Sequence, residues 1–247
     1  MTIDLSLMTD TIATHSRQLA TIADGHLELP IEHCPAWTME DLLRHLLEVH
    51  GFWAAIVDGR LSEPPGAEPV RSVDRDALVG QFLMGAEHLV EVLRAADQSA
   101  AVWTWTPIQR DVAFVTRHQV QETVVHHWDG AHALGRSIDI DSSVASDAIE
   151  EFLTFSMSTE ADPADPVRPA LDGALTLVCT DIDRAWTVRD GRVPGTVRFS
   201  ASVDDAAVRL QAPSSQLLLW LYSRVAIESD ARASALGARL QSLSFTD

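Results

Sequence analysis

The sequence predicts an α+β fold in which an N-terminal four-helix bundle precedes a small C-terminal α/β domain. Two observations carry this prediction. The first 160 residues indicate a succession of helices, with apolar residues at mostly helical spacing over residues 4–24. Short β-type runs then follow a Pro-rich, acidic segment, ADPADPVRPALDG. We therefore place the bundle over residues 1–162 and the second domain over residues 163–247.

Four long helices are expected in the bundle. Thr38 is a good N-cap for the second of them, and Glu40 and Asp41 in its first turn favour the helix dipole. Gly135 fits the end of the fourth helix. The expected helices cover residues 4–24, 38–59, 74–97 and 114–135, with a further helix at 143–160.

The second domain is expected to combine strands with two helices. Its β-type runs lie at 174–180, 184–189, 195–201 and 206–210. An apolar helix beginning at Pro213 covers 213–223, and a last helix covers 231–242.

Composition narrows the class of partner. The chain has 18 basic and 36 acidic residues, a net charge of −18, so it repels phosphate backbones and anionic lipid surfaces. We expect neither nucleic-acid nor membrane partners. Two cysteines, no signal-peptide pattern and no bilayer-length apolar stretch predict a cytoplasmic protein without disulfides.

One stretch of the fourth helix, RHQVQETVVHHWDG, carries polar residues in an apolar setting. His118, Glu122 and His126 follow one another at intervals of four, so they share a helix face. Glu122 and His126 are candidate metal ligands, and a seam of paired polar side chains is the simpler alternative. A third ligand would come from His45 or His50, which lie about 140° apart round the second helix and cannot both face one ion.

Two stretches resemble the mycothiol-dependent maleylpyruvate isomerase family, part of the DinB/YfiT-like metal-binding bundle superfamily. They read CPAWTxxDLxxHL at 34–46 and ExxxHxWD at 122–129. The resemblance implies a DinB-like bundle, a sterol-carrier-like second domain and a divalent metal, usually zinc. It also implies that the metal is held by His45, Glu122 and His126.

The resemblance further implies a thiol cosubstrate. Three protein ligands leave a coordination position open, and a thiol entering there loses its proton to become a nucleophile. Cys34 and Cys179 are more simply explained by packing, so the thiol is external, and the family's thiol is mycothiol. In the family, the thiolate adds to the double bond of maleylpyruvate, the resulting single bond rotates, and the thiol leaves; related members transfer the thiol to other electrophiles.

Arg224 is the candidate catalytic residue of the second domain. It matches a Gly-Arg element of the family that contributes to the active site, although Ser223 replaces the glycine. An arginine there would attract an anionic substrate. An arginine that interacts favourably with the C-terminal end of a helix is an equally good explanation.

Other residues are candidates for supporting roles. Glu48 and Asp129 each lie three positions after a proposed histidine ligand and are able to accept from its second ring nitrogen. His118 is a candidate fourth ligand or orienting partner. Four aromatic residues either wall the pocket or belong to the core: Phe52, Trp53, Trp103 and Trp105.

Two other functions compete with a thiol transferase or isomerase. A binding protein would use the sterol-carrier-like domain, with Leu217–Leu221 lining an apolar cavity. A metal-dependent hydrolase would hold water in the open position, but no general base beyond the ligands is recognisable. We also expect a monomer, because the second domain is available to cover the bundle surface through which single-domain relatives would dimerise.

Overall fold

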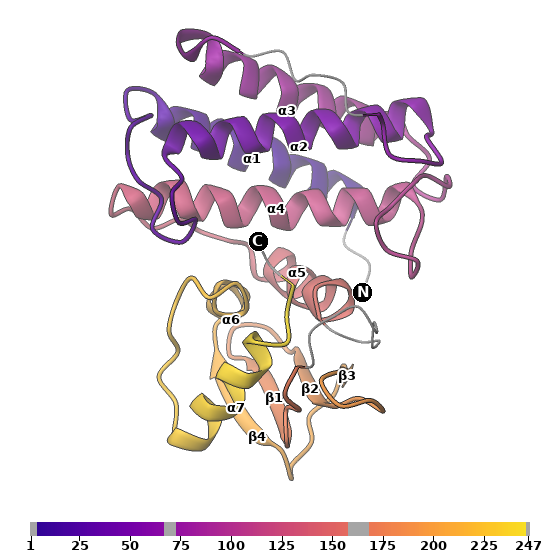
Figure 1. Cartoon of the computed structure of the whole chain (residues 1–247), viewed down its shortest axis with the longest axis vertical. Helices are drawn as coiled ribbons and strands as arrows, with labels where there is room; N and C mark the ends of the chain where they lie inside the picture. The colour runs from indigo at the N-terminus through magenta and orange to yellow at the C-terminus, as the bar shows by residue number, and fades with distance from the viewer. Residues whose placement is uncertain (1–3, 67–72, 158–167, 246–247) are drawn as a thin grey trace. The chain divides into compact units, whose positions relative to one another are not determined.

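The computed structural model describes residues 4–66, 73–157 and 168–245, and it confirms the predicted α+β class (Figure 1). The chain divides into two compact units after Asp139. The predicted boundary after residue 162 lies outside the described residues. The helix before that boundary, α5 (Ser142–Phe155), belongs to the C-terminal unit, whereas the sequence grouped it with the bundle.

The N-terminal unit is a bundle of long helices that begin and end close to the predicted positions. The third helix differs, because a short 3-10 turn, η1, precedes it. Gly135 has a φ of 65°, the left-handed conformation expected just after a helix end. The elements are α1 (Leu5–Ala23), α2 (Met39–Gly59), η1 (Arg75–Ala77), α3 (Leu78–Ala95) and α4 (Val112–Ala133).

The start of α2 is fixed by the predicted cap. The Thr38 backbone N–H donates to the Asp41 carboxylate at 2.8 Å, and the Thr38 hydroxyl accepts from the Asp41 backbone N–H. This reciprocal pair is a capping box, and it sets the register of the helix that carries His45.

The bundle core lies where α1 packs on α3 and α4, and α2 packs on α3 and α4. Its fully buried residues include Leu19, Met39, Leu46 and Phe82. Gly130 of α4 allows a close approach of α1, because a Cβ added there would lie 2.6 Å from Leu19 Cδ1. Helix α4 also buries polar side chains, among them Gln119, Thr123, His127 and Asp129. Buried polar groups need partners, so the interior of the bundle beside α4 is where a site is expected.

The C-terminal unit is built on a sheet of strand order β3-β2-β1-β4. Strands β1 and β2, and β2 and β3, pair antiparallel, while β1 and β4 pair parallel. Helices α6 and α7 pack on β1 and β4. The elements are β1 (Ala174–Cys179), β2 (Ala185–Asp190), β3 (Val197–Ser200), β4 (Val208–Ala212), α6 (Ser214–Leu221) and α7 (Ala231–Gln241).

Helix α5 joins this unit through side chains that the sequence did not connect. The fully buried Trp186 of β2 donates from Nε1 to Glu150 Oε2 at 3.3 Å. Phe152 packs edge-on against Tyr222, with ring centroids 4.9 Å apart. The apolar face of α5 is therefore covered by elements of the C-terminal unit.

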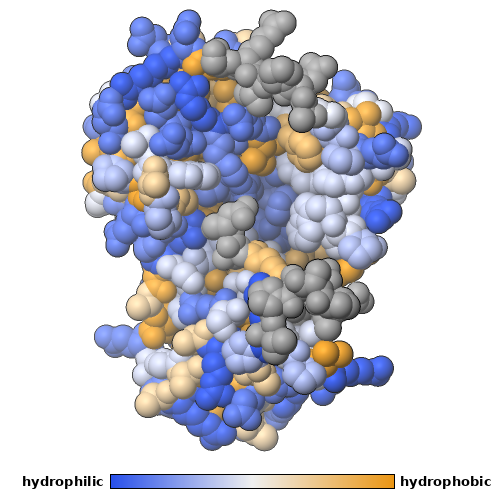
Figure 2. Space-filling view, viewed as in Figure 1, coloured by the Kyte–Doolittle hydropathy of each residue, from blue (hydrophilic) through white to orange (hydrophobic). Residues whose placement is uncertain are grey.

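Hydrophilic residues cover much of the face of the bundle seen in Figure 2, with hydrophobic residues interspersed. Within residues 4–66, 73–157 and 168–245, no helix has both the length and the apolar content needed to span a bilayer.

Candidate metal centre

His45, Glu122 and His126 come together between α2 and α4. His45 Nε2 lies 2.7 Å from Glu122 Oε1, and His126 Nε2 lies 3.5 Å from the same oxygen. The three ligand atoms lie within 4.8 Å of one another. Ligands in a tetrahedral zinc site lie roughly 3.4 Å apart, so these side chains need only small rotations to hold an ion. The donor set, two imidazole nitrogens and one carboxylate, suits a catalytic zinc site.

The site is partly open to solvent. The side chains of His45, Glu122 and His126 are 28 %, 22 % and 12 % exposed, respectively.

The structure separates the two histidines of α2. His50 is fully buried, its Nε2 lies 3.4 Å from Thr123 Oγ1, and its ring stacks on Phe82. Burial lowers the pKa of His50 to about 4, so it is neutral at physiological pH. His45, rather than His50, lies with Glu122 and His126.

Glu122 and His126 stabilise each other's charge. Burial alone would raise the pKa of Glu122, but attraction to His126 and hydrogen bonds from both histidines hold it well below its usual value. Burial alone would lower the pKa of His126. Attraction to Glu122 and contacts with Asp129 and Cys34 instead raise it well above the ordinary range. In the absence of metal, Glu122 is thus a carboxylate paired with a protonated His126.

Asp129 lies directly behind His126. Its side chain is fully buried, and its Oδ2 lies 3.0 Å from His126 Nδ1. A carboxylate there holds the proton on Nδ1 and leaves Nε2, the nitrogen that faces Glu122, to bind a metal. Cys34 Sγ lies 3.8 Å from the same Asp129 oxygen, so Cys34 contacts the carboxylate that holds His126 in place.

Glu48, the equivalent candidate beside His45, has a different environment. Its side chain is exposed, and among the described residues it forms no hydrogen bond with His45. The same three-residue spacing therefore places one carboxylate behind a histidine and the other in solvent.

Trp37 is a residue of the site that sequence reasoning did not assign. Its ring centroid lies 4.9 Å from that of His45 and 6.1 Å from that of His126, so it borders both imidazoles. The preceding residue, Ala36, has a φ of 72°, which turns the chain sharply just before α2. The available signal was the position of Trp37, immediately before the N-cap of the helix that carries His45.

His118 is not one of the converging ligands. Its Nδ1 lies 3.0 Å from Gln121 Nε2, and its ring stacks on Phe114 at a centroid distance of 5.5 Å. The rings of Trp53 and Trp105 contact His118 edge-on, and Phe52 and Trp103 contact Trp53. The four aromatic candidates thus join one cluster around His118, one helical turn before Glu122.

Arg224 belongs to the C-terminal unit and follows α6. It is 8 % exposed, and its Nη1 donates to the Tyr222 carbonyl at 2.9 Å. Ser223 before it has a φ of 60°, a conformation in which glycine is favoured and serine is uncommon. A glycine would adopt this conformation with less strain than the serine does, and the catalytic role of Arg224 stays a prediction.

Fold and site together define a helical-bundle protein in which two histidines and one glutamate form a partly exposed donor set between two helices. Residues 9–131 match the family model of the mycothiol maleylpyruvate isomerase N-terminal domain. Through this domain, which contains all three converging residues, the chain belongs to the mycothiol maleylpyruvate isomerase family, as its motifs predicted.

Solved structures support the fold over most of the chain. A crystal structure of the mycothiol-dependent maleylpyruvate isomerase aligns with a TM-score of 0.56 and 14 % identity, covering 90 % of each chain. The structure of a histidine-to-alanine mutant of the mycothiol-dependent maleylpyruvate isomerase aligns with a TM-score of 0.54 and 11 % identity, covering 88 % of each chain. No curated protein matches the sequence. At these identities, the likeness establishes a shared fold.

Proposed function

We propose that the protein is a metal-dependent enzyme that uses mycothiol as an isomerase or S-transferase, with an electrophile such as maleylpyruvate as substrate. The observation that carries the proposal is the convergence of His45, Glu122 and His126 within a domain of the mycothiol maleylpyruvate isomerase family. The metal is proposed to be zinc, which the donor set favours.

The proposed chemistry needs a thiolate that the chain does not provide. Cys179 is buried, and desolvation raises its pKa to about 12, so it stays a thiol. Cys34 lies against the buried Asp129 behind His126. A divalent metal held by the three ligands would lower the pKa of a thiol at its open position and so supply a nucleophile at neutral pH.

The protein's own side chains would prepare this site. Asp129 holds the proton on His126 Nδ1, and Trp37 packs against the rings of His45 and His126. Arg224 is proposed to bind the anionic substrate. The protein is further proposed to work in the cytoplasm as a monomer.

Metal content per chain is the first test of this proposal. We expect one tightly bound zinc in the wild type and its loss in His45→Ala, Glu122→Ala and His126→Ala. His88→Ala is a matched control, since His88 is an exposed residue of α3 outside the site. Unchanged metal content in the three ligand variants would mean that the residues form a paired polar seam.

Activity is the second test. We expect maleylpyruvate isomerisation, or thiol transfer to another electrophile, only with both mycothiol and metal present. Arg224→Ala should raise KM for the anionic substrate without removing zinc. Bound zinc with no thiol-dependent activity would favour the hydrolase. The alternative of an apolar-ligand carrier would use Leu217–Leu221, which are all buried, as both core residues and the lining of an apolar cavity would be.

A further inference from the structure

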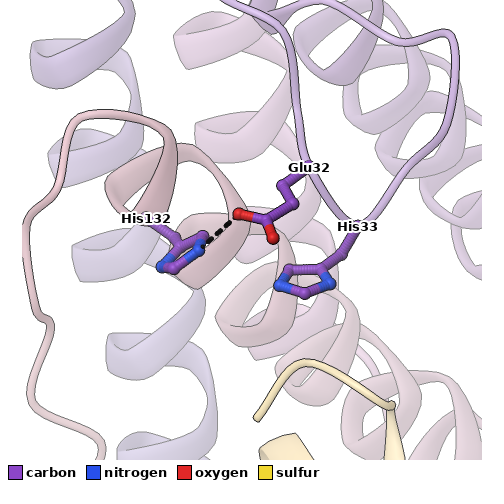
Figure 3. A group of neighbouring side chains, drawn as sticks. All are labelled: Glu32, His33 and His132. Carbon is purple, nitrogen blue, oxygen red and sulfur yellow. Dashed lines mark hydrogen bonds and ion pairs between the residues drawn. The ribbon is translucent and has the colours of Figure 1, made fainter.

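A second group of metal-ligand side chains lies at another place on the bundle. Glu32 and His33 come from the loop before α2, and His132 comes from the last turn of α4 (Figure 3). We propose that these three residues form a second binding site for a divalent transition metal, with zinc preferred. One ligand atom from each lies within 4.8 Å of the others.

The donor atoms already face one another. His132 Nε2 lies 3.0 Å from Glu32 Oε2, and Figure 3 shows the Glu32 carboxylate between the two imidazole rings. Two imidazole nitrogens and a carboxylate are the same donor set as in the first site, and imidazole favours zinc over magnesium or calcium. Glu32 is an exposed side chain, so it is free to rotate by the small amount that shortens the remaining ligand distances.

The two rings are held in position by Trp128. Its ring stacks on His132 with centroids 4.5 Å apart and an interplanar angle of 11°, and it lies 5.5 Å from the His33 ring. The two histidine rings are themselves 5.4 Å apart. Ligands that are fixed before the ion arrives lose less conformational entropy on binding.

The loop that carries Glu32 and His33 is also fixed. Its ends are joined by an antiparallel bridge between Pro30 and Thr38, and the Ile31 backbone N–H donates to the Trp37 carbonyl at 2.9 Å. The side chain of Ile31 is buried in the bundle core. Two ligands therefore sit on a closed loop and the third on a helix.

Charge and exposure both favour a cation here. His132 lies at the C-terminal end of α4, where the helix dipole is negative, and Glu32 adds a full negative charge. The side chains of Glu32 and His132 are 69 % and 39 % exposed, so water can complete the coordination. An ion pair this exposed contributes little to stability by itself, so it does not account for the arrangement.

The two sites share no residue. His126 and His132 are six positions apart on α4, which turns their side chains about 120° away from each other round the axis. The same closed loop nevertheless carries Trp37 and Cys34, which contact the first site. A metal in the second site would hold this loop against the end of α4.

Metal titration of the full chain, freed of any affinity tag and treated with a chelator, tests the proposal. We expect two equivalents of Zn²⁺ per chain by calorimetry, the second more weakly bound. The double variant His33→Ala/His132→Ala should bind one equivalent. Glu32→Gln should weaken the second equivalent by about tenfold or more, because the loss of a direct ligand costs at least as much as the loss of a residue that supports one.

Control variants keep the two sites apart. His45→Ala/His126→Ala should retain the Glu32 site and lose the tighter equivalent, and His88→Ala should bind as the wild type does. Circular dichroism shows whether each variant is folded. A single wild-type equivalent that folded His33→Ala/His132→Ala still binds, or two equivalents in that folded variant, would overturn the proposal. Either result leaves the first site, which the His45 variants report, unaffected.

Discussion

At the scale of single residues, the candidate centre depends on which nitrogen of His126 is available. Nδ1 faces Asp129 and Nε2 faces Glu122, so one ring joins a buried carboxylate to the proposed ligand set. A proton held on Nδ1 fixes both the tautomer and the direction of the ring. The function of Asp129 is thus exerted through His126, and we class it as a positioning residue.

Asp129→Asn should weaken zinc binding at the first site by about 10- to 100-fold, the usual cost of losing a carboxylate behind a histidine ligand. Competition with a chromophoric chelator measures the affinity. Glu48→Gln is the matched control, because Glu48 has the same spacing from His45 but is exposed, and its zinc affinity should not change. Equal losses in the two variants would contradict the positioning role of Asp129.

The sequence could identify which types of residue form the site, but not which particular residues of those types come together. Helical spacing pairs Glu122 with His126, but the choice of His45 over His50 required the family resemblance, since both lie on α2. The sequence could not show that Asp129 is buried behind His126 while Glu48 is exposed, because burial depends on which helix packs opposite each residue. The contact of Trp37 with both histidines arises from a loop turn that has no periodic signal.

At the scale of elements, α1 and α4 approach closely at Gly130. The two helices run in the same direction where they pack. His15 contacts His127, and Leu19, one turn later on α1, lies beside Gly130, one turn later on α4. A side chain at position 130 would push α1 away from the helix that carries two of the proposed ligands. The glycine therefore serves packing, at some cost in helix propensity.

Gly130→Ala should destabilise the protein by roughly 1–2 kcal/mol, because overpacking against Leu19 and Met39 exceeds the gain in helix propensity. Gly51→Ala in α2 should instead stabilise it by about 0.5–1 kcal/mol, since no atom beyond the helix's own nearby backbone lies within 4 Å of the added Cβ. Urea unfolding of both variants measures the difference. A Gly130→Ala protein as stable as Gly51→Ala would mean that α1 moves without cost.

Most elements were predictable because each carries local signals. Apolar periodicity locates α1, the Thr38 cap locates the start of α2, and Gly135 locates the end of α4. The β-type runs locate the four strands to within a few residues. Their pairing was not predictable, because the parallel contact between β1 and β4 joins runs that are distant in sequence. The assignment of α5 to the C-terminal unit was not predictable either, because it depends on contacts with residues distant in sequence, among them Trp186 and Tyr222.

At the scale of the whole molecule, stability should depend on pH through histidines buried in the bundle. His15 Nδ1 lies 2.8 Å from His127 Nδ1, so one ring donates and the other accepts, and both rings are neutral. Burial lowers the pKa of His15 to about 4, with Asp139 acting weakly against it. Burial, helped by repulsion from His15, lowers the pKa of His127 to about 4 as well.

The free energy of unfolding should therefore fall as the pH drops from about 6.5 to about 4. In that range the unfolded chain takes up protons at these histidines and the folded chain does not, so acid favours unfolding. Above pH 6.5 both states are neutral and the pair contributes no pH dependence. Together the two histidines account for an effect on the order of a few kcal/mol at the acid end of the range.

A variant without the pair isolates this effect. We expect His15→Leu/His127→Leu to lose less stability than the wild type between pH 6.5 and 4.5, with urea unfolding measured in chelator so that metal release does not contribute. Above pH 6.5, where neither histidine titrates, the free energies of unfolding of the two proteins should change with pH in the same way. If the free energies of unfolding of the two proteins stayed parallel down to pH 4.5, His15 and His127 would gain protons as readily in the folded protein as in the unfolded chain. The bundle would then admit water at this place.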